Sequence, residues 1–211
     1  MPLALPGRLV LLDYGEVISR SQSEVDRAAI LELAGRPAEA FWPAYWSERD
    51  RLDHGRLSVR DYWLGIGRAC GAEWDDARLQ SLWAADLRSW VSVEPEVVGI
   101  MAALHAAGTR LAVLSNAGFD YSLLRGSPLA ALVERIFLSA ELGLVKPDPA
   151  IYLAVANELG IPPEQIVFVD NKASNVAGAE SVGMTGHVFT DADSLRAFLT
   201  ALATDHEGDH G

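Results

Sequence analysis

The sequence predicts an α/β domain in which a mainly parallel sheet is flanked by helices and interrupted by a helical insert. Short apolar runs recur along the chain and helical patterns separate them, which is the order of a parallel sheet with crossover helices. Residues 20–91 break this alternation, because they contain dense helix signals, no convincing strand and all six tryptophans. The 211 residues, half of them hydrophobic, suffice for one domain with an insert.

Five strands are expected, four of them from short, continuous apolar runs. Such runs are typical of strands that are buried on both faces of a parallel sheet. The first reads "RLVLL" and is followed by Asp13, and the other strong runs read "RLAVL", "IFL" and "IVFV". The fifth run is weaker. We assign the strands to Arg8–Leu12, Arg110–Leu114, Ile136–Leu138, Ile166–Val169 and Gly186–Phe189.

Helices fill the intervals between these strands. Pro95 stands in the first turn of its helix, where proline fits because its missing N–H would have no helical partner. Gly160 and Gly183 follow the next two helices as stop signals. The expected ranges are Glu94–Gly108, Pro149–Leu159, Lys172–Val182 and Asp193–Leu202.

Residues 20–91 are expected to form a helical cap on a core made of residues 1–19 and 92–205. Ser23 and Asp26 form a capping pair at the start of the first cap helix, and Gly35 ends it. The other cap helices are expected at Pro37–Arg49, Ser58–Cys70 and Asp75–Arg88. Residues 206–211 are polar and are expected to form a flexible tail.

Composition excludes several classes of protein. The net charge of −12 repels phosphate backbones, so we expect no nucleic-acid partner and a phosphate site that depends on local donors and a cation. The single cysteine, Cys70, cannot pair within the chain, which fits a reducing cytoplasm. We expect no signal peptide and no membrane span, because the N-terminal apolar run lacks a basic flank and is broken by Asp13.

Polar residues follow four of the expected strands. Asp13 follows the first strand, Ser115 and Asn116 follow the second, and Asp170 with Asn171 follows the fourth; Lys146 comes after the third in "VKPDP". Ligands of open α/β sheets bind outside the carboxyl ends of the strands. These groups should therefore converge on one edge, where Asp13 is a candidate nucleophile and not merely a turn residue.

The order of these motifs resembles the haloacid dehalogenase (HAD) superfamily of aspartate-nucleophile hydrolases. The motifs read "LLDYGEV", "VLSNAG", "GLVKPDPAIY" and "VFVDNKASNVAGAESVGM" and span nearly the whole chain. The resemblance implies a Rossmann-like core with an inserted all-helical, C1-type cap. Within the superfamily, "DHGRLSVRDYW" and the D-x-G-x-V motif look similar to the phosphatase domain of soluble epoxide hydrolase and to bacterial glucose-1-phosphate phosphatases.

The resemblance also implies a set of roles. Asp13 would attack phosphorus and form an aspartyl-phosphate that water hydrolyses. Lys146 would neutralise the nucleophile and the transferred group, and Ser115 with the N–H of Asn116 would hold phosphate oxygens. Mg²⁺ is the implied cofactor. Its implied ligands are Asp13, Gly15, Asp170 and Asn171.

Two positions depart from the family pattern. Gly15 stands where a second aspartate usually acts as general acid, a service worth roughly 10²–10⁴-fold in rate. We expect this glycine to allow a sharp turn that brings its carbonyl near a cation. Asn171 replaces an acidic metal ligand with a neutral amide. A slow enzyme, a substrate with a good leaving group, or loss of phosphatase activity would follow.

Several other residues have a structural and a functional interpretation. Glu16 could replace the missing acid, but a contact with solvent or with the cap is favoured, and the same holds for His54. Asn175 is expected to hold the site by hydrogen bonds, and Tyr152 to pack in its helix. Trp42 and Trp46 share a helix face and are interpreted mainly as cap core, with stacking on a sugar as the alternative.

Three functions remain open from the sequence. The favoured one is a Mg²⁺-dependent phosphatase of a small phosphorylated metabolite, such as a sugar phosphate, with the cap selecting the substrate. A second is a 2-haloacid dehalogenase, in which the aspartate attacks carbon without a metal; "SNAG", Lys146 and Tyr152 fit this chemistry too. A third is a catalytically impaired binding or regulatory protein, suggested by Gly15 and Asn171 together.

Overall fold

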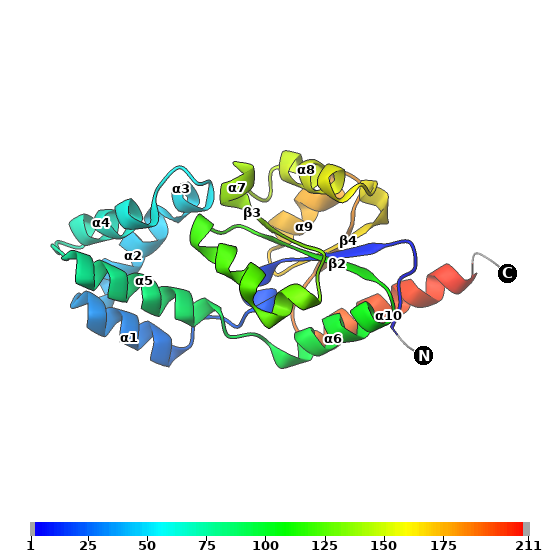
Figure 1. Ribbon diagram of the computed structural model, residues 1–211, viewed down its shortest axis with the longest axis horizontal. Helices are drawn as coiled ribbons and strands as arrows, with labels where there is room; N and C mark the ends of the chain where they lie inside the picture. The colour runs from blue at the N-terminus through cyan, green and yellow to red at the C-terminus, as the bar shows by residue number, and fades with distance from the viewer. Residues whose placement is uncertain (1–2, 209–211) are drawn as a thin grey trace.

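The computed structural model describes residues 3–208, and side chains up to residue 204. A five-stranded, fully parallel sheet with the order β3-β2-β1-β4-β5 forms its centre (Figure 1). The strands are β1 (Leu9–Leu12), β2 (Arg110–Ser115), β3 (Arg135–Leu138), β4 (Ile166–Asp170) and β5 (Thr185–Val188). The sequence prediction of each strand is confirmed to within one residue at either end.

Helices cover both faces of this sheet. α6 (Pro95–Ala106) and α10 (Ala192–Gly208) lie on one face, and α8 (Pro149–Leu159) and α9 (Ala173–Glu180) lie on the other (Figure 1). Val10 and Leu12 of β1 pack into the first layer, while Leu9 and Leu11 pack into the second. Successive side chains of a strand point to opposite faces, and helices cover both faces of this sheet, so both sets are fully buried. This explains the unbroken apolar run in the sequence.

The strand order reverses beside β1. The chain proceeds from β1 outward to β2 and β3, then returns to place β4 and β5 on the other side. Two crossovers therefore leave in opposite directions from neighbouring strands and open a crevice at their carboxyl ends. Ligands of such folds bind at this switch point.

The cap is a five-helix unit with its own hydrophobic core. Its helices are α1 (Glu24–Ala34), α2 (Ala38–Ser47), α3 (Arg49–Asp53), α4 (Val59–Ala69) and α5 (Asp76–Trp90). Ser23 accepts a hydrogen bond from the N–H of Asp26, and α1 ends at Gly35 with a left-handed φ of +61°, as expected. The helix expected at 37–49 is split, because the backbone leaves helical geometry at Glu48 (φ −104°, ψ 2°).

Two paired linkers join the cap to the core. Ser19 and Val93 form an antiparallel bridge, and the N–H of Glu94 donates to the carbonyl of Ile18 at 2.8 Å. The loop after α3 also touches the core, where Ser139 Oγ donates to the Asp53 carbonyl at 2.5 Å. A Cβ at Gly55 would lie 2.7 Å from the carbonyl oxygen of Ala140, so this close approach requires glycine.

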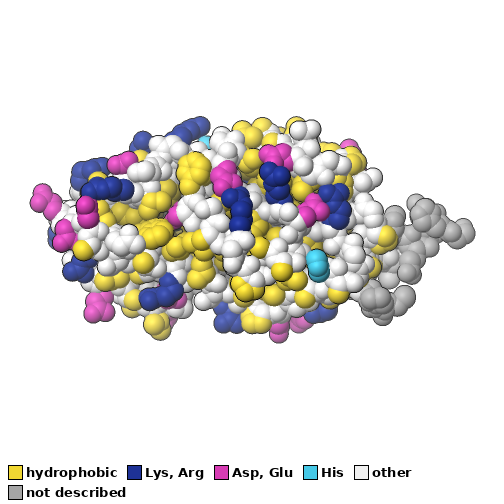
Figure 2. Space-filling view, in the orientation of Figure 1, with side chains coloured by type: hydrophobic (Ala, Val, Ile, Leu, Met, Phe, Trp, Pro, Cys, Tyr) yellow, Lys and Arg dark blue, Asp and Glu magenta, His cyan; other side chains and the backbone are white. Residues whose placement is uncertain are grey.

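The remaining elements are short and were not predicted. They are α7 (Ser139–Leu142) and the 3-10 helical segments η2 (Phe119–Gly126), η3 (Pro128–Ala131) and η4 (Pro163–Gln165). α10 continues to Gly208, past the boundary expected at 205, and the rest of the expected tail lies outside the described residues. No helix within residues 3–208 is long and apolar enough to cross a membrane. Acidic and basic side chains are interspersed on the face shown in Figure 2.

Candidate active site

The carboxyl edge of the sheet brings the predicted residues together. Asp13 directly follows β1, Ser115 ends β2 and Asp170 ends β4, while Lys146 enters from the loop before α8. Asp13 is anchored in the sheet, because its N–H donates to the Val169 carbonyl at 2.8 Å. The convergence expected from strand order is thus observed at the switch point beside β1.

Lys146 is buried between two carboxylates. Its Nζ lies 2.8 Å from Asp13 Oδ1 and 2.7 Å from Asp170 Oδ2, and it donates to the Leu114 carbonyl at 3.0 Å. Only 1% of its side chain is exposed. Burial raises the pKa of Asp13 to about 6, and Lys146 opposes this shift. Asp13 is therefore mainly ionised at neutral pH, as a nucleophilic carboxylate must be.

Asp170 lies behind Lys146 and is fully hydrogen-bonded. Besides Lys146, Asp170 accepts from the N–H of Lys172 at 2.8 Å and from Asn175 Nδ2 at 3.0 and 3.1 Å. Tyr152 in turn donates its hydroxyl to the Asn175 carbonyl at 2.6 Å. The expected structural roles of Asn175 and Tyr152 agree with these contacts, which orient Asp170 and hence Lys146.

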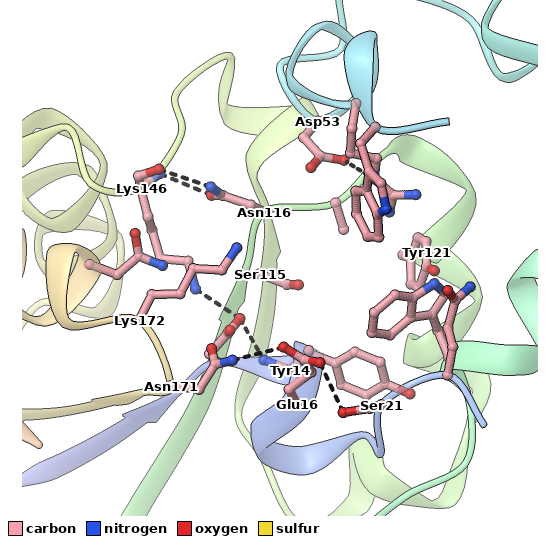
Figure 3. A pocket seen from close by; sticks show the side chains of 18 of the residues that line it. Tyr14, Glu16, Ser21, Asp53, Ser115, Asn116, Tyr121, Lys146, Asn171 and Lys172 are labelled. Carbon is pink, nitrogen blue, oxygen red and sulfur yellow. Dashed lines mark hydrogen bonds and ion pairs between the residues drawn. The ribbon is translucent and has the colours of Figure 1, made fainter. Parts of the chain in front are cut away.

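Asn116 fixes the lysine loop to β2. Its Nδ2 donates to the Lys146 carbonyl, and its Oδ1 accepts from the Lys146 N–H, both at 2.9 Å. The Asn116 side chain is thus occupied by this pairing, which leaves its backbone for any contact with a ligand. Ser115 is nearly buried, and its hydroxyl points into the open space between these groups (Figure 3).

The turn η1 (Tyr14–Ile18) differs from the expectation for Gly15. Gly15 has φ −67° and ψ 121°, and a Cβ there would meet nothing within 4 Å, so glycine is not needed for the turn. The left-handed conformation falls instead on Glu16, at φ +60°. A residue with a side chain carries this strain at roughly 1 kcal/mol or more, which is typical of functional sites.

The side chains of Glu16 and Asn171 form a second cluster beside Asp13. Glu16 accepts from Asn171 Nδ2 at 2.9 Å and from Ser21 Oγ at 2.8 Å (Figure 3). The contact with the Ser21 linker is the kind of cap contact that we favoured for Glu16. Asn171 Oδ1 is buried and has no hydrogen-bond partner among the described residues. An orphaned amide oxygen of this kind suits a cation or water as its missing partner.

A cavity of about 490 Å³ lies between this edge and the cap. Of the seven predicted site residues, Asp13, Gly15, Ser115, Asn116, Lys146 and Asn171 line it, and Asp170 supports it from behind. Trp46 lines the cavity, whereas Trp42 packs in the cap core under the guanidinium of Arg27. His54 is absent from the cavity lining, and its ring Nδ1 lies 2.8 Å from the Asp50 carbonyl in its own helix region.

The cap contributes a charged cluster that the sequence analysis missed. Arg49 lines the cavity and lies 3.1 Å from Asp53 and 3.9 Å from Asp86, which also accepts from the Tyr45 hydroxyl. Burial raises the pKa of Asp53 to about 6, and Arg49 opposes the shift. Arg49 ends a predicted helix, and no local pattern indicated that it faces the core. Lys172 was likewise overlooked, although it follows Asn171 directly.

Comparison with known proteins gives the family. Residues 8–183 match the family model described as haloacid dehalogenase-like hydrolase. The chain belongs to this family. It is 32% identical over 198 residues to flavin mononucleotide hydrolase 1 of Arabidopsis thaliana, and the aligned region covers 92% of the chain and 77% of that protein. It is 24% identical to D-ribitol-5-phosphate phosphatase of Bacteroides thetaiotaomicron, over 92% and 97% of the two chains.

Solved structures support the same fold. A HAD family enzyme of Bacteroides thetaiotaomicron, solved as an Asp-to-Ala mutant with magnesium and inorganic phosphate, superposes with a TM-score of 0.70 at 19% identity over 87% and 94% of the chains. L-2-haloacid dehalogenase of Xanthobacter autotrophicus gives 0.61 at 20% identity over 85% and 76%. The chain is thus a HAD-superfamily hydrolase with a Rossmann-like core, as predicted. Its placement near epoxide hydrolase or glucose-1-phosphate phosphatases stays a prediction.

Proposed function

We propose that this hydrolase is a phosphatase of a small phosphorylated metabolite, with Asp13 as the nucleophile. The carrying observation is the position of Asp13, which is fixed at a strand end, lines the cavity between the sheet edge and the cap, and is paired with a buried lysine at 2.8 Å. Several curated relatives are named for the hydrolysis of phosphate monoesters, namely flavin mononucleotide, ribitol 5-phosphate and phosphoglycolate. Their variety supports the reaction class and leaves the substrate open, with a sugar phosphate as one choice.

Each site residue has one role in a two-step hydrolysis of the phosphate ester. A carboxylate oxygen of Asp13 bonds to phosphorus while the bond to the leaving oxygen breaks, which gives an aspartyl-phosphate and an alcohol after proton uptake. Water then cleaves the aspartyl-phosphate and releases inorganic phosphate. Ser115 and the N–H of Asn116 hold phosphate oxygens, and Lys146 offsets the charge that builds up between nucleophile and phosphate.

We further propose that Mg²⁺ binds beside Asp13. The donors that fit are the Asp13 carboxylate, the Gly15 carbonyl and the orphaned Asn171 Oδ1. A single carboxylate suits Mg²⁺ when a phosphate is bound, since this ion keeps several waters and is usually held by one or two carboxylates plus phosphate oxygens. Bound there, it would neutralise part of the phosphate charge. We assign Asp170, whose oxygens already accept from three residues, to orienting Lys146 in place of binding metal.

Protonation of the leaving oxygen is the weak point of this site. Gly15 has no side chain to supply a proton, and Asp53 and Asp170 are both paired with cations. Glu16 lines the same cavity and has hydrogen-bond donors but no cationic partner among residues 3–204. We propose that Glu16 takes up a proton from solvent and passes it to the oxygen of poor leaving groups, whereas good leaving groups need none.

The deciding experiment is hydrolysis of an aryl phosphate with and without Mg²⁺. The wild type should turn over with Mg²⁺, Asp13→Asn should lose at least roughly 10³-fold of the rate because the nucleophile is gone, and the exposed control Asp193→Asn should match the wild type. Metal-independent turnover would remove the Mg²⁺ proposal alone. Equal rates for Asp13→Asn and wild type would refute the assignment of the nucleophile.

A second candidate is 2-haloacid dehalogenase chemistry. It is favoured by the 32% identity over 95 residues to (S)-2-haloacid dehalogenase 1 of Pseudomonas. The scarcity of acidic metal ligands also favours it, since no cluster of three His, Cys, Asp or Glu side chains within residues 3–204 suits a metal. Chloride release from a 2-chloroacid without metal, with no phosphate release, would establish it. Binding of phosphate without either turnover would instead indicate an impaired binding protein. The single cysteine keeps our expectation of a cytoplasmic setting.

A further inference from the structure

Both lysines of this chain lie at the same cavity. The sequence holds fifteen arginines but only two lysines, Lys146 and Lys172, and both line the space beside Asp13. An ammonium is a compact charge on a flexible stem, and it suits an anion whose position shifts during a reaction. The placement of both lysines at one edge of the sheet calls for a role for the second.

Lys172 is held at its backbone and free at its ammonium. Its N–H donates to Asp170 Oδ1 at 2.8 Å, which fixes the residue at the start of α9. Its side chain is exposed and points into the cavity toward Ser115 (Figure 3). Within residues 3–204 no hydrogen bond or ion pair engages its Nζ, unlike that of Lys146, which is used by two carboxylates.

The charge at the cavity floor explains why a second cation is needed. Asp13, Lys146 and Asp170 together carry a formal charge of −1 when ionised, since two carboxylates face one ammonium. A phosphate dianion that approaches Asp13 meets repulsion from this cluster. Asn171 adds no charge, so Lys172 is the uncommitted cation on the core side of the cavity. It also interacts with the cap, because its positive charge acts to lower the pKa of Asp53.

We propose that Lys172 binds the anionic phosphoryl group of the substrate alongside Lys146, and that it supplies part of the positive charge that metal binding provides. This proposal rests on the proposed phosphatase function. Substrate binding is then expected to persist at low Mg²⁺, because the chain carries its own cation on the open side of the site.

Binding of inorganic phosphate to the full-length protein tests this directly. We expect calorimetry to show that Lys172→Gln weakens phosphate binding about tenfold, with and without Mg²⁺, as for the loss of one charge-assisted hydrogen bond. Lys172→Arg should keep most of the affinity. Arg196→Gln removes one charge from an exposed site on α10 that does not line the cavity, and it should bind as the wild type does.

Kinetics separates this role from a purely structural one. Lys172→Gln should raise the KM for an aryl phosphate more than it lowers kcat, and its melting temperature should match the wild type because the side chain is exposed. If Lys172→Gln binds phosphate as tightly as Arg196→Gln does, the proposal for Lys172 is overturned and the phosphatase function stays intact. If Lys172→Gln binds phosphate more weakly but the wild type hydrolyses no phosphate ester, the anion-binding role of Lys172 stands and the phosphatase function is overturned.

Discussion

Removal of the buried ammonium of Lys146 should be the most damaging single substitution at the site. In Lys146→Met, Asp13 and Asp170 remain beside each other with 10% and 0% of their side chains exposed and no cation between them. Loss of one partner from a buried ion pair costs about 3–5 kcal/mol, because the remaining charge is desolvated and unbalanced. A domain of ordinary stability has about 5–15 kcal/mol in total. Urea unfolding should therefore place the variant near the edge of folding at pH 8.

The double variant Lys146→Met/Asp170→Asn provides the matched control. It removes one of the two unbalanced carboxylates, so it should recover at least about 1 kcal/mol relative to the single variant, since groups in direct contact couple at 0.5–3 kcal/mol. The repulsion left in Lys146→Met should raise the pKa of Asp13 further above its value of about 6. A folded carboxyl with a raised pKa gains stability as pH falls, so the deficit should shrink between pH 8 and pH 5. A loss below 1 kcal/mol, unchanged with pH, would refute this account.

The other predictions concern the reaction and the cap. For the wild type, kcat/KM should fall about tenfold per pH unit below about pH 6, because Asp13 must be ionised to attack and burial raises its pKa to about 6. A profile of kcat/KM that is flat from pH 5 to 8, after correction for ionisation of the substrate, would contradict this. Glu16→Gln should leave aryl phosphate hydrolysis within about threefold of wild type but slow alkyl phosphate hydrolysis by roughly 10²-fold or more. Equal losses on both substrates would exclude an acid role. Arg49→Met should lower the free energy of unfolding in urea by roughly 3 kcal/mol, because it leaves the buried Asp86 and Asp53 without a cationic partner. The exposed Arg51→Met should lower it by less than 1 kcal/mol.

The core could be predicted because its signals are local. Strands β1 to β4 are buried along most of their length, so a short apolar run marks each of them without knowledge of its neighbours, whereas the partly exposed edge strand β5 gave the weaker signal. Asp13, Ser115 and Asp170 could then be placed together because parallel strands end at one edge. The termini of α1 and α8 followed from Gly35 and Gly160, which both adopt left-handed φ angles.

The parts that were missed depend on contacts across long sequence distances. Arg49 faces the cavity because the cap folds back over the core through paired linkers, and helix patterns contain no information on that orientation. The break at Glu48, which splits α2 from α3, has no proline or glycine beside it, since the nearest such residue before it is Pro43 inside α2. At the turn after β1, the sharp turn was expected to depend on Gly15, but the left-handed conformation falls on Glu16, whose side chain accepts hydrogen bonds from Asn171 and Ser21.

The overall acidity of the protein and its proposed anionic substrate are compatible because they act over different distances. The net charge of −12 is spread over the whole chain, and at physiological ionic strength its field decays over about 8 Å. Lys146 and Lys172, by contrast, act on a bound phosphate group at contact distance, where the attraction between two charges is strongest. An acidic surface therefore costs little affinity at the site, while it disfavours phosphate groups attached to a long polyanion that must lie along that surface. This difference favours a small phosphate ester, free to enter the cavity by itself, over a phosphate within a nucleic acid.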